Sequence, residues 1–100
     1  MESCQSKFYN TLHRSFSEIP PCNDYKNIYI CSVLIEYGFN DDNCPYPELD
    51  NMWWNVLQFG FENRMTQIAT QTCDGLTGYN ELWIRRSQET HGWLSWKKIG

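Results

Sequence analysis

Apolar and polar positions alternate along much of the chain with a period of two, which is typical of β-strands. Residues 25–37 are rich in Ile, Tyr, Val and Cys and contain no Gly or Pro. Both of their alternating faces are apolar, so we expect this segment to be a central strand. Residues 52–61 and 64–72 show the same alternation on either side of Glu62-Asn63. A connection of two residues predicts an antiparallel hairpin.

The rest of the second half continues as short strands and turns, whereas residues 38–51 form a long polar loop of the kind that is often functional. A turn is expected at 74–78, a strand at 79–86, a polar turn at 87–92 and a last strand at 93–99. Strands at this spacing indicate a mainly β fold. We therefore predict a small antiparallel β-meander, arranged as a sandwich or a partly open barrel.

The beginning of the chain has a different period. Three apolar residues recur there at four-residue spacing, as on one face of a helix: Phe8, Leu12 and Phe16. We predict a short helix over residues 5–17, which ends before Pro20 and Pro21 because proline fixes φ and lacks an amide donor. Residues 1–17 are thus expected to be a helical lead-in, and residues 18–100 the β domain.

Composition limits the class of function. Eight basic and twelve acidic residues give a formal net charge of −4, which argues against nucleic-acid binding, since that requires a basic surface. No segment approaches the roughly 20 apolar residues of a membrane-spanning helix, so we expect no membrane insertion. The first residues lack the basic and apolar regions of a signal peptide. We expect a chain that stays in the cytosol or leaves it by a route that needs no signal.

The cysteine pattern favours reduced thiols. The chain has five cysteines, and none belongs to the Cys-x-x-Cys pair of a typical zinc site. The odd number and the lack of a signal peptide argue against disulfides, although a bond between Cys22 and Cys44 stays open. Cys31 lies in an apolar run and is expected in the core. We expect no metal and no other cofactor.

The last part of the chain carries its most specific motif. Trp83-Ile84-Arg85 is followed by a polar turn with Gly92 and then by Trp93-Leu94-Ser95-Trp96-Lys97. In this order and near the end of the chain, these segments resemble the carboxyl-terminal pyocin-knob type of domain found in phage tail fibres and related contractile particles. The step Thr66-Gln67-Ile68 on an earlier strand fits the same pattern. The resemblance covers residues 18–100, closely in the second half and loosely before it.

The resemblance implies a virion protein at the tip of a tail fibre, assembled in the bacterial cytoplasm together with other tail proteins. It implies a non-enzymatic domain, trimeric in the fibre, that attaches to a host cell-surface glycan or protein. The alternative is a purely structural domain that trimerises or caps the fibre. A small glycan hydrolase is a weaker alternative, because twelve acidic residues make some carboxylate pair inevitable.

Candidate contact residues come from the strands and from the 38–51 loop. Trp53 and Trp54 are adjacent, so on a strand they point to opposite faces, and one of them is exposed or at an interface if the other lies in the core. Binding surfaces favour exposed Trp and Tyr. The candidate set for receptor contact is Trp53, Trp54, Tyr46, Asp41, Asp42, Trp83 and Arg85.

Several candidates also have structural interpretations. Arg85 can bind an acidic sugar through its planar fork, or it can hydrogen-bond to backbone carbonyls and hold the terminal segment, which its place in the motif favours. Trp93, Trp96 and Lys97 are expected to hold the chain end on the sheet, with the two Trp on opposite sides of a strand. The oxygens of the 38–51 loop could bind Ca²⁺, but they lack EF-hand spacing and a solvated turn is favoured.

Overall fold

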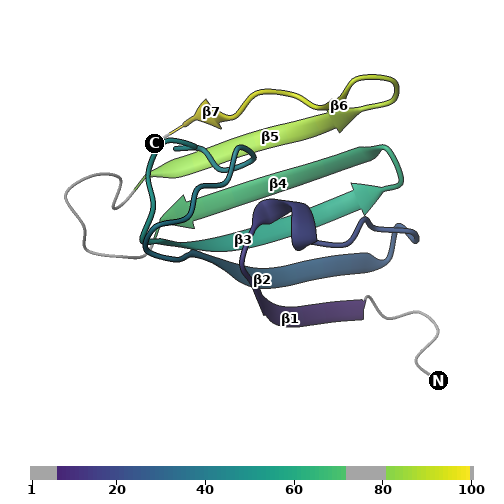
Figure 1. Ribbon diagram of the computed structural model, residues 1–100. Helices are drawn as coiled ribbons and strands as arrows, with labels where there is room; N and C mark the ends of the chain where they lie inside the picture. Colours follow the sequence, from purple (N-terminus) through teal and green to yellow (C-terminus); the bar gives the residue numbers. More distant parts are fainter. Residues whose placement is uncertain (1–6, 72–80, 100) are drawn as a thin grey trace.

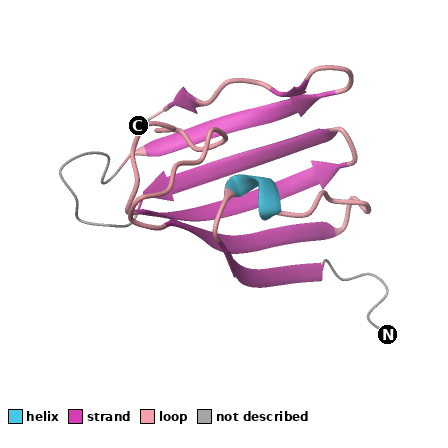
Figure 2. Ribbon diagram, in the orientation of Figure 1, coloured by secondary structure: helices cyan, strands magenta, loops and turns pink. Residues whose placement is uncertain are grey.

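The computed structural model describes residues 7–71 and 81–99. Within these ranges seven strands form one sheet: β1 (Lys7–His13), β2 (Asn27–Ile35), β3 (Met52–Phe61), β4 (Arg64–Gln71), β5 (Leu82–Gln88), β6 (Gly92–Trp93) and β7 (Lys97–Lys98). Strands β1 to β6 follow one another across the sheet in chain order, and β7 also pairs with β5 (Figure 1; Figure 2). The fold is mainly β, as the alternation predicts. The described strands form one open sheet, not two stacked sheets or a closed barrel.

Strands β2 to β5 form the predicted antiparallel meander, because each of them pairs with the next in the opposite direction. The bounds of β3 and β4 agree with the prediction to within one residue, since their alternation is regular and Glu62-Asn63 is the whole connection. Strand β5 continues two residues past its predicted end, because Ser87 and Gln88 pair with β6. The turn predicted at 74–78 and the predicted start of β5 at Tyr79 lie outside the described residues.

The predicted helix over residues 5–17 is wrong. Residues 7–13 are β1, which runs parallel to β2, and the 3-10 helix η1 (Phe16–Glu18) is the nearest helical turn. Asn, Thr and His, which occur in β1, are weak helix formers, and the edge of β2 offers hydrogen-bond partners along the whole segment. Pairing with the sheet therefore outweighs the four-residue spacing. No helix in the described ranges has the length and apolarity to span a membrane.

One face of the sheet, the core face, carries the hydrophobic core. Alternate residues of β2, β3 and β4 are buried on it. The irregular segments before and after β2, residues 14–26 and 36–51, fold over this face, and Figure 1 shows η1 in front of the sheet. Trp54 is completely buried there and meets Phe16 edge to face, with ring centroids 6.3 Å apart. The core is thus a sheet covered by loops rather than by a second regular layer.

The opposite face, the open face, is not covered by another described segment. Four large side chains on it remain between 39% and 45% exposed: Ile30, Trp53, Phe59 and Phe61. The register places Trp53 beside Leu34 of β2, and Phe59 beside Thr66 of β4. Exposed apolar patches of this kind mark interaction surfaces in soluble proteins. The open face is therefore a candidate for contact with a partner.

The three cysteines within the described residues are free and buried: Cys22, Cys31 and Cys44. The disulfide between Cys22 and Cys44 that the sequence leaves open is not formed. Burial raises the pKa of the Cys31 thiol to about 11 and that of the Cys44 thiol to about 12. Both thiols therefore stay protonated at neutral pH and are weak nucleophiles. Cys4 and Cys73 lie outside the described residues.

Candidate binding site

Arg85 of β5 points to the core face, where aromatic rings enclose it. Its guanidinium carbon lies 4.5 Å from the ring centroid of Trp93, 4.6 Å from that of Trp96 and 5.8 Å from that of Phe16. We call these three rings and Arg85 the aromatic cage. Burial lowers the pKa of Arg85 to about 10, while the Asp41 carboxylate acts in the opposite direction. Arg85 thus keeps its charge at neutral pH, and cation–π attraction holds the terminal segment on the sheet.

The two Trp of the terminal motif lie on one side of the sheet, so the expectation of opposite sides is wrong. Strand β6 ends at Trp93 and β7 begins at Lys97, and the residues between them are not strand. This interruption lets both rings turn toward Arg85. Trp96 Nε1 also donates a hydrogen bond of 2.8 Å to the carbonyl oxygen of Asn43. The motif therefore ties the end of the chain to β5 and to the 38–51 loop, while Lys97 stays exposed.

A row of buried polar side chains crosses three strands next to the cage. Arg85 Nε donates to Gln67 Oε1 at 2.7 Å, and Gln67 Nε2 donates to Gln58 Oε1 at the same distance. Gln58 Nε2 in turn donates to the carbonyl oxygen of Pro20 at 2.8 Å. These bonds satisfy polar groups that burial would otherwise leave unpaired. The sequence-based expectations do not include this row, although its signal is present as two Gln residues at positions of the alternation that face the core.

Tyr46 and Trp83 meet in a second cluster around Glu81. The Tyr46 hydroxyl donates to Glu81 Oε1 at 2.6 Å, Trp83 Nε1 donates to the same oxygen at 3.0 Å, and Lys98 Nζ lies 3.3 Å from Glu81 Oε2. The hydrogen bond from Tyr46 is the main cause that lowers the pKa of Glu81, and the same bond raises the pKa of Tyr46 to about 12. The Tyr46 hydroxyl and the Trp83 Nε1 group thus form hydrogen bonds within the protein.

Two acidic side chains of the 38–51 loop, Asp41 and Asp50, accept hydrogen bonds from backbone amides. Asp41 is buried and accepts hydrogen bonds from the Phe16 amide at 2.7 Å and from the Asn43 amide at 3.0 Å. Asp50 accepts a hydrogen bond of 2.6 Å from the Gly38 amide. Among residues 7–71 and 81–99, no group of three or more His, Cys, Asp and Glu side chains is placed to hold a metal ion. These contacts fix the shape of the loop, and Asp42 remains exposed on it.

The candidate contact residues do not form one surface. Six of them belong to the core face or to the loop over it: Trp54, Tyr46, Asp41, Asp42, Trp83 and Arg85. Trp54 is 0% exposed and cannot touch a partner in the folded chain. Trp53 points to the open face and is 39% exposed. The prediction that this Trp pair is split between the core and an exposed face is confirmed.

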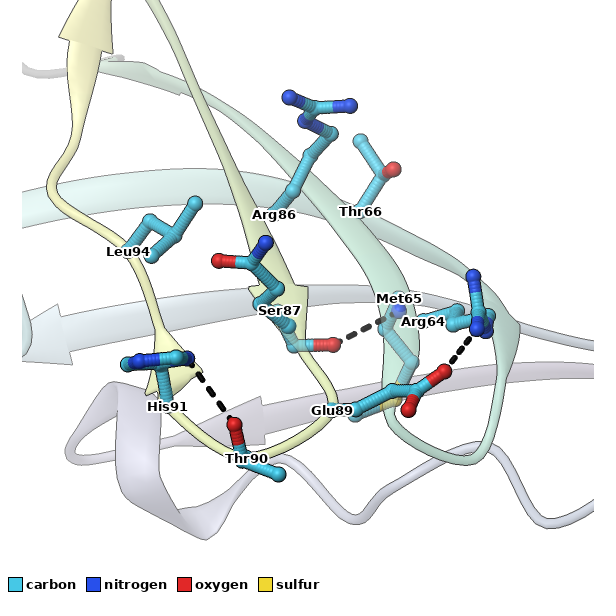
Figure 3. A pocket seen from close by; sticks show the side chains of 10 residues that line it. Arg64, Met65, Thr66, Arg86, Ser87, Glu89, Thr90, His91 and Leu94 are labelled. Carbon is cyan, nitrogen blue, oxygen red and sulfur yellow. Dashed lines mark hydrogen bonds and ion pairs between the residues drawn. The ribbon is translucent and has the colours of Figure 1, made fainter.

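A pocket of about 570 Å³ lies where the start of β4, the end of β5 and the segments on either side of β6 meet (Figure 3). We call it the β4–β6 pocket. It is lined by Arg64, Met65, Thr66, Arg86, Ser87, Gln88, Glu89, Thr90, His91 and Leu94. Arg86 and Thr66 are opposite each other in the strand register, and Figure 3 shows their side chains pointing the same way. At the other end of the pocket, Arg64 forms an ion pair with Glu89.

The β4–β6 pocket combines the groups that bind sugars. Its volume is in the range of small-molecule sites, and hydroxyl, amide and guanidinium groups can hydrogen-bond to a ligand inside it. An apolar border adjoins it on the open face, because Phe59 is opposite Thr66 and Phe61 is opposite Arg64. A pyranose ring has the matching character, with hydroxyls around its edge and apolar C–H groups on its faces. The pocket and the two rings therefore fit a glycan better than a wholly apolar ligand.

The sequence predicts residues 87–92 of this region as a polar turn. The pocket exists because the chain after β5 folds back, so that the Leu94 amide donates to the Arg86 carbonyl at 2.9 Å and β6 pairs with β5. A register of two residue pairs is too short to be read from alternation. The available signal was the adjacent pair Arg85-Arg86, since two neighbours on a strand point to opposite faces and only one can enter the core.

Comparison of the chain with protein-family models, curated proteins and solved structures finds no match.

The pocket lining includes one carboxylate, that of Glu89, and it is paired with Arg64. Glycoside hydrolysis by the usual routes needs two carboxyl groups on either side of the scissile bond.

Proposed function

We propose that this chain is a non-enzymatic attachment domain of a phage tail fibre or a related particle, and that it binds a glycan on the host cell surface. The observation that carries the proposal is the β4–β6 pocket, whose polar lining adjoins the exposed rings of Phe59 and Phe61. The order of the terminal motif, which resembles that of knob domains, supports the placement at a fibre tip. The motif itself serves the core through the aromatic cage.

In the proposed mechanism a sugar ring lies across the end of the sheet. Phe59 supplies an apolar surface for one face of the ring, while Thr66 and Gln88 offer a hydroxyl and an amide to its edge. These few contacts support weak binding by one copy of the domain, with a Kd of about 0.1 to 1 mM. Several copies on one particle raise the effective affinity by roughly 10² to 10⁴, provided that they reach the surface together.

Replacing Thr66 with valine is expected to weaken glycan binding by about 2- to 13-fold, because the side chain keeps its shape but loses a hydroxyl worth about 0.5 to 1.5 kcal/mol. Thr70→Val is the matched control, since Thr70 lies on the same strand and face but outside the β4–β6 pocket. Binding is measured on an array of bacterial surface polysaccharides. No bound glycan in any sample, or an equal loss in both variants, would rule out the pocket as a glycan site.

The open face supports a second candidate, a structural domain that assembles with further copies of this chain. A shallow hollow of about 390 Å³ at its centre is lined by uncharged residues: Ile30, Cys31, Ser32, Asn55, Val56, Leu57, Ile68 and Thr70. A second copy would present the same uncharged surface, so neither copy would bury a charge. Sedimentation velocity of the wild type and of Ile68→Glu distinguishes the candidates. If the wild type forms an oligomer that Ile68→Glu dissociates, and if no glycan binds, the structural role is favoured.

A further inference from the structure

We infer that the glycan bound in the β4–β6 pocket carries an acidic group, and that Arg86 is the main partner of this group. The inference rests on the proposed function and narrows the ligand class to sugars that bear a carboxylate, phosphate or sulfate. Three features support it: the charge balance of the pocket, the contacts of Arg86 and the row of residues across β3, β4 and β5.

The charge of the pocket is opposite in sign to that of the whole chain. Two arginines and one glutamate line it, which gives a net charge of +1 without counting His91, whereas the chain has a formal net charge of −4. Glu89 pairs with Arg64 and so offsets one of the two arginines. The positive charge that remains is that of Arg86.

Arg86 differs from the other arginines in its contacts. Arg14 Nε lies 3.5 Å from Glu36 Oε2, and Arg64 forms an ion pair with Glu89. Arg85 is enclosed in the aromatic cage. Arg86 is exposed and has no ion pair among the described residues. Lys97 adds positive charge nearby, because it is opposite Ile84 in the register and so shares the open face with Arg86. A cation without a partner in a concave site is suited to an external anion.

A row of three side chains gives the position of the ligand. Phe59, Thr66 and Arg86 are opposite one another on three adjacent strands and share the open face. Adjacent strands lie about 4.8 Å apart, so Phe59 and Arg86 are separated by roughly 10 Å. This span accommodates an acidic pyranose with its ring on Phe59, a hydroxyl near Thr66 and its carboxylate on Arg86. The planar guanidinium can hold a carboxylate through two parallel hydrogen bonds.

Two pairs of sugars that differ in the acidic group test this inference: the methyl β-glucuronide with the methyl β-glucoside, and the methyl galacturonide with the methyl galactoside. Each is titrated into the ¹⁵N-labelled protein and followed by NMR. The wild type is expected to bind at least one acidic sugar about tenfold more tightly than its neutral partner. Arg86→Gln is expected to lower the affinity for the acidic sugar to about that for its neutral partner, so that the preference is lost, while an exposed substitution preserves the fold.

Arg14→Gln is the matched control, because it removes the same charge from an exposed arginine beyond β1, at the opposite edge of the sheet. It is expected to keep the preference for the acidic sugar. Equal affinity for acidic and neutral sugars in the wild type would overturn the inference and leave the proposed function in place. A preference that survives in Arg86→Gln, or is lost equally in Arg14→Gln, would also overturn it. No binding of any of the four sugars or of the surface polysaccharides would overturn both proposals.

Discussion

Replacing Arg85 with alanine is expected to lower the free energy of unfolding by about 3 to 5 kcal/mol. Three losses add up in this variant. The Trp93 and Trp96 rings lose the cation between them, and a cavity remains where the side chain was. Gln67 Oε1 also loses its donor in a buried site, so the polar row ends in an unsatisfied acceptor. Urea denaturation followed by far-ultraviolet circular dichroism measures the change.

The next residue provides the control. Arg86→Ala removes the same side chain from the open face, where it is exposed and has no ion pair among the described residues. Its unfolding free energy is expected to stay within about 0.5 kcal/mol of the wild type. If both variants lost the same stability, or if Arg85→Ala lost less than about 1 kcal/mol, the aromatic cage would not be the feature that holds the terminal segment.

Replacing Gly60 with alanine is expected to cost about 3 kcal/mol or more, or to prevent folding. Gly60 lies next to the hairpin turn with φ +119, a conformation that side chains rarely adopt, and it is opposite Met65. An added Cβ would clash with the Arg64 carbonyl oxygen and would lie 2.7 Å from Met65 Cα. Both obstacles are backbone atoms of β4, so relief of the clash would require the two strands to separate.

Gly92→Ala separates the steric clash from the backbone strain. Gly92 also has a positive φ, of +67, but an added Cβ would meet no atom within 4 Å. The expected cost is therefore the conformational one alone, about 1 to 2 kcal/mol. Thermal unfolding by circular dichroism compares the two variants. An equal loss in both would contradict the close approach between β3 and β4 at Gly60.

The central strands were predictable because the alternation of apolar and polar residues in their sequence matches the burial of their two faces. In β3 and β4 the residues of one face are buried and those of the other are more exposed, so the alternation reports the structure directly. The start of the chain was not predictable in this way. Phe8, Leu12 and Phe16 have helical spacing, but β1 is formed by pairing with an edge of β2 that a local pattern does not contain.

The candidate site was predicted in parts. The split of Trp53 and Trp54 follows from adjacency alone and is confirmed. The position of Arg85 in a cage does not follow from adjacency, because it depends on the break between β6 and β7 that brings two distant Trp rings to one guanidinium. The β4–β6 pocket depends on the same fold-back of the chain. Tertiary contacts between residues far apart in sequence thus determine which of two neighbouring arginines is structural and which is available to a ligand.

Amide chemical-shift mapping tests most directly whether this chain binds glycans at the β4–β6 pocket. The ¹⁵N-labelled protein is titrated with oligosaccharides from bacterial surface polysaccharides, and the shift of each assigned amide is followed. We predict that at least one glycan shifts the amides of residues 64–66 and 86–91 and leaves those of the 38–51 loop unchanged. Shifts confined to that loop or to the region of Trp53, or no shifts with any glycan, would contradict the account.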